Sequence, residues 1–122
     1  MSRGDGMTVN VLGAKYQIEF QNDEKVCAAM CVEVGECGGY CSHAAKRIVI
    51  GNLDKCDDSE EEKEITRKTN LRHEIVHAFL NESGLCWNSK ATDCWAKNEE
   101  MVDWFALQGP KIYKAWQEAE AL

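Results

Sequence analysis

Five consecutive residues carry the clearest chemical signal of this chain, His73-Glu74-Ile75-Val76-His77. They follow the pattern H-E-x-x-H inside a segment whose apolar spacing predicts an α-helix. Because residues i and i+4 of a helix lie one above the other, we expect both imidazoles to point toward a single metal ion. Glu74 lies next to that face and could accept a proton from a water molecule that the metal acidifies, as zinc-assisted hydrolysis requires.

A second motif follows, Asn98-Glu99-Glu100-Met101-Val102-Asp103. Between His77 and Glu99 lie 21 residues, enough for a helix end, a loop and a second helix that runs back past the first. Glu99 is the expected third ligand, since two histidines and one glutamate form a standard catalytic zinc set that leaves the fourth position to water. Glu100 takes that place if the helix is rotated. Asp103 shares the helical face of Glu99, where it can accept the free ring N–H of either histidine.

Other interpretations stay open at the level of sequence. His73 and His77 could be two core or surface histidines without a ligand role. His43, the only other histidine, falls on an expected edge hairpin, where it could approach the metal or polarise a substrate carbonyl, or be a plain surface residue. Tyr40 and Tyr113 could donate to an oxyanion, although nothing in their spacing selects them.

Taken together, the two motifs resemble those of the gluzincin metallopeptidases, the thermolysin-like group, in a very reduced form. The stretch from Glu99 to Ala106 is similar to the third-ligand helix of the ImmA/IrrE-type peptidases of phages and mobile elements, and the chain resembles the small phage- or prophage-encoded minigluzincins. The resemblance covers roughly residues 39–109, and its specific part is confined to the two helices. It implies that His73, His77 and Glu99 bind zinc. It also implies that Glu74 is the general base and that Asp103 is the carboxylate partner of a ligand.

This resemblance implies an α+β, zincin-like fold, in which a small antiparallel β-sheet packs on the H-E-x-x-H helix and a third-ligand helix follows. It also implies one catalytic Zn²⁺ and peptide-bond hydrolysis in a peptide or protein substrate, with a specific phage or bacterial host protein as target. No histidine follows the motif, which rules out the metzincin and SprT-like patterns. The large gluzincins carry substrate-binding domains for which this chain has no room. The alternative is therefore a catalytically weak or inactive, metal-stabilised regulatory or binding module of a mobile element.

Composition favours one domain over residues 1–122, with residues 1–7 disordered. A net charge of −7 argues against nucleic acid as a partner, because phosphate binding needs a basic surface. No apolar run is long enough for a transmembrane helix or a secretory signal, so we expect no membrane partner and, by default, a cytoplasmic location. The oligomeric state is left open.

Seven cysteines are many for a cytoplasmic chain. Four of them have the spacing C-x3-C-x5-C-x3-C, which departs from the paired C-x2-C knuckles of structural zinc: Cys27, Cys31, Cys37 and Cys41. We expect reduced thiols, and keep as alternatives a second metal site or a disulfide, within this group or between Cys86 and Cys94. A thiol redox protein is disfavoured because C-x-x-C is absent.

The N-terminal half is expected to form strands. Alternation predicts strands over 8–12 and 15–20 with a turn at Gly13-Ala14, and then a short helix from residue 22 or 23 to 31. A hairpin over 40–43 and 46–51 follows, with Ile48 and Ile50 on one face. In zincins an edge strand binds the substrate backbone, so we expect a peptide to dock at this hairpin.

The C-terminal half is expected to form helices. Ser59 and Glu62 have capping-box spacing and predict a helix that begins near Ser59 and ends with Gly84 as its C′ residue. Its apolar stripe is expected to consist of Leu71, Ile75, Ala78 and Phe79. Asn98 is expected to cap a second helix with three inward-facing residues: Val102, Phe105 and Ala106. Gly109-Pro110 should end or kink it. A terminal amphipathic helix over 111–121 should then cover the core with Ile112, Tyr113 and Trp116.

Overall fold

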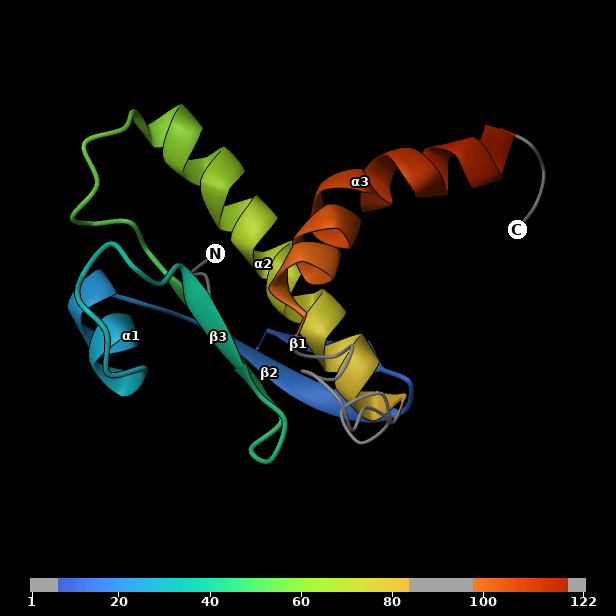
Figure 1. Cartoon of the computed structure of the whole chain (residues 1–122), viewed down its shortest axis with the longest axis horizontal. Helices are drawn as coiled ribbons and strands as arrows, with labels where there is room; N and C mark the ends of the chain where they lie inside the picture. The colour runs from blue at the N-terminus through green and yellow to red at the C-terminus, as the bar shows by residue number, and fades with distance from the viewer. Residues whose placement is uncertain (1–6, 84–97, 119–122) are drawn as a thin grey trace.

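The computed structural model describes residues 7–83 and 98–118, which form a four-stranded sheet and three helices (Figure 1). In chain order these are β1 (Thr8–Val11), β2 (Ala14–Gln21), α1 (Asp23–Ala29), β3 (Gly39–Ser42), β4 (Arg47–Gly51), α2 (Glu60–Glu82) and α3 (Glu99–Glu118). The α+β class is confirmed. Met7, which we expected to be disordered, accepts a hydrogen bond from the backbone of Ile18 at 3.0 Å, and residues 1–6 lie outside the described residues.

The sheet has the strand order β1-β2-β4-β3 and is mixed, so the expected antiparallel sheet is wrong. β1 pairs antiparallel with β2 and β3 pairs antiparallel with β4, but β2 and β4 run parallel. The physical reason is visible in β4, where Ile48, Val49 and Ile50 are all fully buried. A strand covered on both faces carries a continuous apolar run, as central parallel strands do.

Helices on both faces of the sheet bury β4. Ile48 and Ile50 point to the face that α2 covers, where they join a core with Val11, Tyr16 and Ala78. Val49 points the opposite way, because successive side chains of a strand alternate, and α1 packs on β4 with the buried Val26 and Cys27. The predicted shared face of Ile48 and Ile50 is confirmed. The first turn differs from the prediction by one residue and falls at Leu12-Gly13.

α2 begins as its sequence predicts. Ser59 accepts a hydrogen bond from the backbone of Glu62, and the Glu62 carboxylate accepts one from the backbone of Ser59, which completes the capping box. Leu71 and Ile75 pack against the core, but Phe79 is 38% exposed and does not belong to the apolar stripe. The helix ends at Glu82 with Ser83 as its cap. Gly84, the predicted end, lies outside the described residues.

α3 begins after Asn98, whose side-chain oxygen accepts the backbone N–H of Met101 at 2.9 Å, as predicted. The helix continues through Gly109-Pro110 to Glu118, so the expected separate terminal helix is wrong, although the ribbon changes direction along its length (Figure 1). A proline at position 110 cannot donate to the carbonyl of Ala106, and the guanidinium of Arg72 on α2 donates to that oxygen instead, at 3.1 Å.

The faces of α3 are only partly as expected. Val102 and Ala106 are buried, whereas Phe105 is 43% exposed and lies against Trp104 in an edge-on ring contact. Tyr113 is exposed rather than packed on the core, and the side chain of Trp116 lies outside the described part of the chain. Within residues 7–83 and 98–118, no helix combines the length and the apolar character needed to cross a membrane.

Candidate metal centre

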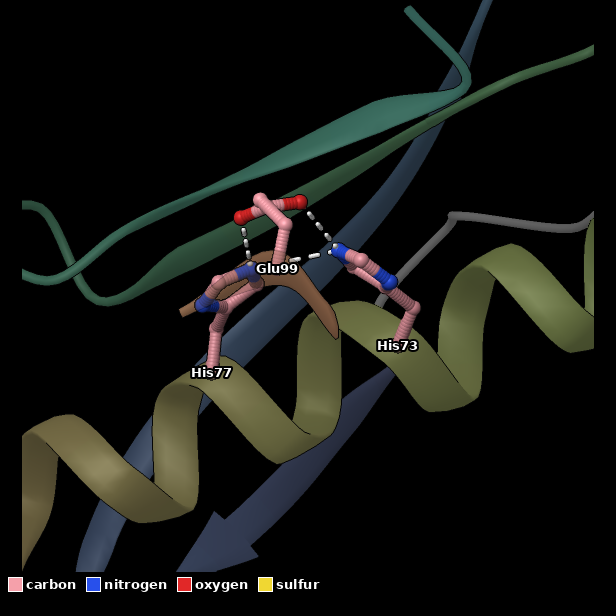
Figure 2. Close-up of side chains that lie close together, drawn as sticks. All are labelled: His73, His77 and Glu99. Atoms are coloured by element: carbon pink, nitrogen blue, oxygen red, sulfur yellow. Dashed lines mark hydrogen bonds and ion pairs between the residues drawn. The ribbon is translucent and has the colours of Figure 1, made fainter. Parts of the chain in front are cut away.

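Three side chains from two helices converge on one point. His73 and His77 stand one turn apart on α2, and Glu99 is the first residue of α3 (Figure 2). The Nε2 atoms of the histidines are 3.1 Å apart, and the Glu99 carboxylate oxygens lie 3.2 Å from Nε2 of His73 and 2.9 Å from Nε2 of His77. All three therefore offer a donor atom to the same space, and the group could hold a metal ion.

The spacing of the two histidine nitrogens fits a tetrahedral ion. Ligand atoms about 2.0–2.1 Å from zinc at tetrahedral angles lie about 3.3 Å from one another. The two histidine nitrogens are 3.1 Å apart, close to that value. Glu99 places a different carboxylate oxygen beside each ring, Oε2 at 3.2 Å from His73 and Oε1 at 2.9 Å from His77.

Asp103 supports the first histidine. Its Oδ1 lies 2.5 Å from Nδ1 of His73, one helical turn beyond Glu99 on the same face of α3. A carboxylate there accepts the Nδ1 proton, so Nε2 of His73 presents its lone pair toward Glu99 and His77. A lone pair at that atom is what a histidine ligand offers to a metal ion.

Glu74 differs from its neighbours in being buried. It is 7% exposed and its carboxylate lies 3.8 Å from Nε2 of His73, whereas the Glu99 side chain is 66% exposed. Burial raises the pKa of Glu74 to about 7. His73 acts against that rise, and the negative charges of Glu99 and Asp103 add to it. Glu74 is thus placed to exchange a proton near neutral pH rather than to remain permanently charged.

A cavity of about 1000 Å³ opens over these residues. Residues 36–44, which run from the segment before β3 to the turn after it, form one wall, and α2 with the first turns of α3 forms the other. β3 is the edge strand of the sheet, so its outer backbone groups are not used by another strand of the described residues. The cavity is therefore bordered by a strand edge on one side and the donor group on the other.

His43 lies at the rim of this cavity and contacts α2. Its Nε2 is 3.2 Å from the carboxylate of Glu82, which also accepts hydrogen bonds from Lys46 and from the buried hydroxyl of Tyr16. His43 is thus tied to the end of α2 rather than grouped with His73 and His77. Tyr40 also lines the cavity, and its hydroxyl accepts a hydrogen bond from Arg47.

Two further candidates lie away from the donor atoms. Glu100 is exposed at the start of α3 and is not part of the three-residue group. Tyr113 lies on the outer half of α3, with 53% of its surface exposed. Neither the fallback ligand nor this tyrosine is brought to the metal centre.

The cysteines of the described residues are free thiols, among them Cys27, Cys31, Cys37 and Cys41. Burial raises the pKa of Cys41 to about 12, and it raises the pKa of Cys37 as well. Within residues 7–83 and 98–118, His73, His77 and Glu99 are the only group with metal-ligand spacing, so the cysteines form no second centre there. Cys86 and Cys94 lie outside the described residues.

Two polar residues of the cavity were missed at the level of sequence. Asn70 and Asn81 line it on α2, three residues before His73 and four residues after His77. Their spacing places them on the histidine face, which was the available signal. The amide of Asn70 lies against the wall at Gly38, where a Cβ atom would stand 2.5 Å from its Nδ2.

No family model, no curated protein and no solved structure matches this chain. The interpretation of the metal centre therefore rests on its residues and their geometry.

Proposed function

We propose that the protein is a zinc-dependent peptidase that hydrolyses a peptide bond with Glu74 as general base. The observation that carries the proposal is the convergence of His73, His77 and Glu99 on one point, beside the buried carboxyl group of Glu74. Two imidazoles and one carboxylate are a usual ligand set for catalytic zinc, and they leave a coordination position open. The open cavity over that position gives a substrate room to enter.

Each residue then has a defined part in the reaction. Bound by His73, His77 and Glu99, zinc would supply a Lewis acid that polarises the substrate carbonyl and acidifies a water molecule. Glu74 takes one proton from that water as its oxygen attacks the carbonyl carbon. It returns the proton to the amine that leaves when the C–N bond breaks, so Glu74 is regenerated.

The strand edge offers the substrate a place to bind. An extended peptide can pair with the free side of β3, because main-chain hydrogen bonds add a strand to an exposed sheet edge. It would then lie between β3 and α2, in the cavity that both elements line. The scissile bond would cross the cavity over the donor group, within reach of Glu74.

Metal content tests the ligand assignment. The wild-type protein is expected to bind one equivalent of zinc, Glu99→Ala to lose it, and Glu100→Ala to keep it. The two substitutions remove the same charge from adjacent positions of α3, so they form a matched pair. Absence of zinc in the wild type, with no uptake on addition, would return the two histidines to a structural role.

Turnover tests the role of Glu74. Glu74→Gln keeps the side-chain volume but cannot accept the proton, so it is expected to retain zinc and lose cleavage of a mixed peptide library read by mass spectrometry. Full activity of the metal-loaded Glu74→Gln protein would show that the mechanism is wrongly assigned.

A second candidate function is a metal-stabilised binding or regulatory module. It is favoured by one observation: the donor group joins α2 to α3, so a bound ion would hold the two helices together. Under this alternative, His73→Ala should release α3, whereas Glu74→Gln should leave the biological effect unchanged. The two functions are separated by Glu74→Gln alone.

A further inference from the structure

Arg72 makes an unusual contact with α3. Its Nε donates to the backbone carbonyl of Ala106 at 3.1 Å. In a regular helix that carbonyl would accept the N–H of the residue four positions later, which here is Pro110 and has no N–H. Ala106 is 2% exposed, so without Arg72 its carbonyl would lose a hydrogen bond in a buried place.

The guanidinium is itself held in position. Its Nη2 donates to Oγ1 of Thr69, one turn earlier on α2, at 3.2 Å. The Thr69 hydroxyl in turn donates to the backbone carbonyl of Ile65 at 3.0 Å. Arg72 is therefore oriented toward α3 by its own helix rather than free to turn into solvent.

This contact belongs to a series that aligns the two helices. Three contacts join α2 to α3: His77 to Glu99, His73 to Asp103, and Arg72 to Ala106. The residue numbers fall along α2 as they rise along α3, so the two helices run in opposite directions where they touch. Sliding α3 by one helical turn would move each of its residues by about 5.4 Å along the helix axis. Glu99 would then be out of reach of the two histidines.

Few apolar side chains at the start of α3 are fully buried. Glu99 and Asp103 have side chains that are 66% and 60% exposed, and Trp104, Phe105 and Leu107 are also largely exposed. Buried apolar contacts between residues 99 and 107 come from Val102 and Ala106. The hydrogen bond from Arg72 to Ala106 is directional, so it specifies the register of α3 against α2. Small apolar side chains do not specify that register.

We infer that Arg72 is a positioning residue for the metal centre. By donating to the carbonyl that Pro110 leaves open, it fixes α3 in the register that brings Glu99 to His73 and His77. The proline makes the acceptor available, and the arginine binds it. This inference rests on the proposed zinc site, and it assigns Arg72 no contact with metal or substrate.

Two readouts separate positioning from a purely structural role. Arg72→Met removes the donor and is expected to lower the Tm of the metal-free protein by about 5 °C and to weaken zinc affinity about tenfold. In the double variant Arg72→Met/Pro110→Ala, the backbone N–H restored at position 110 can donate to Ala106, so the Tm should recover. Zinc affinity should stay about tenfold weak, because the bond between the two helices is still missing.

Arg67→Met is the matched control. Arg67 lies on the same helix and donates to a backbone carbonyl in the same way, but its acceptor is Asn52, in the loop before α2, at 2.8 Å. Its loss should lower the Tm by a similar amount and leave zinc affinity unchanged. The contrast between the two arginines isolates the effect of the contact with α3.

The outcomes distinguish this inference from the proposed function. A wild-type protein that binds no zinc overturns both. Zinc binding by the wild type, with equal affinity in Arg72→Met, overturns the inference alone. Recovery of affinity together with Tm in Arg72→Met/Pro110→Ala also overturns it, because Arg72 would then serve only to satisfy the carbonyl. Weak affinity with a recovered Tm supports it.

Discussion

Nδ1 of His73 lies 2.5 Å from Oδ1 of Asp103, so the ring of a residue on α2 is oriented by a carboxylate of α3. The same two helices supply the three donor atoms. The position of α3 therefore determines both the third donor and the orientation of the first. A change that moves this helix should affect the metal centre even where it leaves all three donor residues in place.

Removal of Asp103 should weaken metal binding without abolishing it. Asp103→Ala is expected to lower zinc affinity by about 10- to 100-fold, because the partner of a ligand histidine fixes its tautomer and increases its basicity. Asp103→Asn should fall between this variant and the wild type, since its amide oxygen still accepts the ring N–H without the charge. Competition with a chromophoric chelator measures the affinities. Wild-type affinity in Asp103→Ala would contradict the role given to this carboxylate.

Chelation should destabilise the protein through the same centre. A ligand that binds only the folded state at 100 times its Kd stabilises it by about 2.7 kcal/mol, which corresponds to about 10 °C in Tm for a chain of 122 residues. We expect EDTA to lower the Tm of the wild type by roughly that amount. His77→Ala is the control, and its Tm should be the same with and without EDTA. An equal shift in both proteins would indicate that zinc binds elsewhere.

Local signals in the sequence predicted local structure well. The capping box of Ser59 and Glu62 and the cap at Asn98 are both present, because each depends on residues three positions apart. The helical spacing of His73 and His77 likewise places their rings together. Interactions of this range are encoded in a few neighbouring residues, so they can be read without knowledge of the fold.

What the sequence missed depends on distant residues. β4 runs parallel to β2 because the chain leaves β2 through α1, forms the edge strand β3 and then turns back as β4 between β3 and β2. Strand spacing alone does not reveal this order. Gly109-Pro110 was expected to end or kink the helix; α3 does not end there, and its ribbon changes direction along its length (Figure 1). The contact of Arg72 with the Ala106 carbonyl, 34 positions away, could not be read from the local sequence. Phe79 and Phe105 follow the apolar period of their helices but remain exposed, since no described element covers them.

Two adjacent glycines should differ in their tolerance of a methyl group. A Cβ at Gly39 would lie 2.5 Å from the backbone oxygen of Val49, so Gly39→Ala must separate β3 from β4, and we expect a loss of about 1–3 kcal/mol in the free energy of unfolding. The three atoms nearest to a Cβ at Gly38 all belong to the side chain of Asn70, which can rotate away. Gly38→Ala should therefore cost less. Urea unfolding compares them, and equal losses would contradict this packing of the sheet edge.

The carboxylate of Glu82 should make stability depend on pH. Hydrogen bonds from Lys46 and then from Tyr16 lower its pKa below 4.5, and the positive charge of Lys46 adds to the effect. A carboxyl group with a lowered folded-state pKa stabilises the protein above its unfolded-state pKa, and this contribution disappears as the pH falls through the folded-state value. Glu82→Gln should therefore be less stable than the wild type at pH 7, and the difference should shrink below about pH 4.5.

Tyr16→Phe offers a graded form of the same test. It removes the hydrogen bond from Tyr16 and leaves the contacts of Lys46 and His43 with Glu82, so the pKa of Glu82 should fall less far below its ordinary value. The pH dependence of unfolding in this variant should lie between those of the wild type and Glu82→Gln. Denaturant unfolding between about pH 3 and pH 8 measures all three proteins. Parallel curves for the wild type and Glu82→Gln over that range would show that these contacts do not favour the ionised carboxylate.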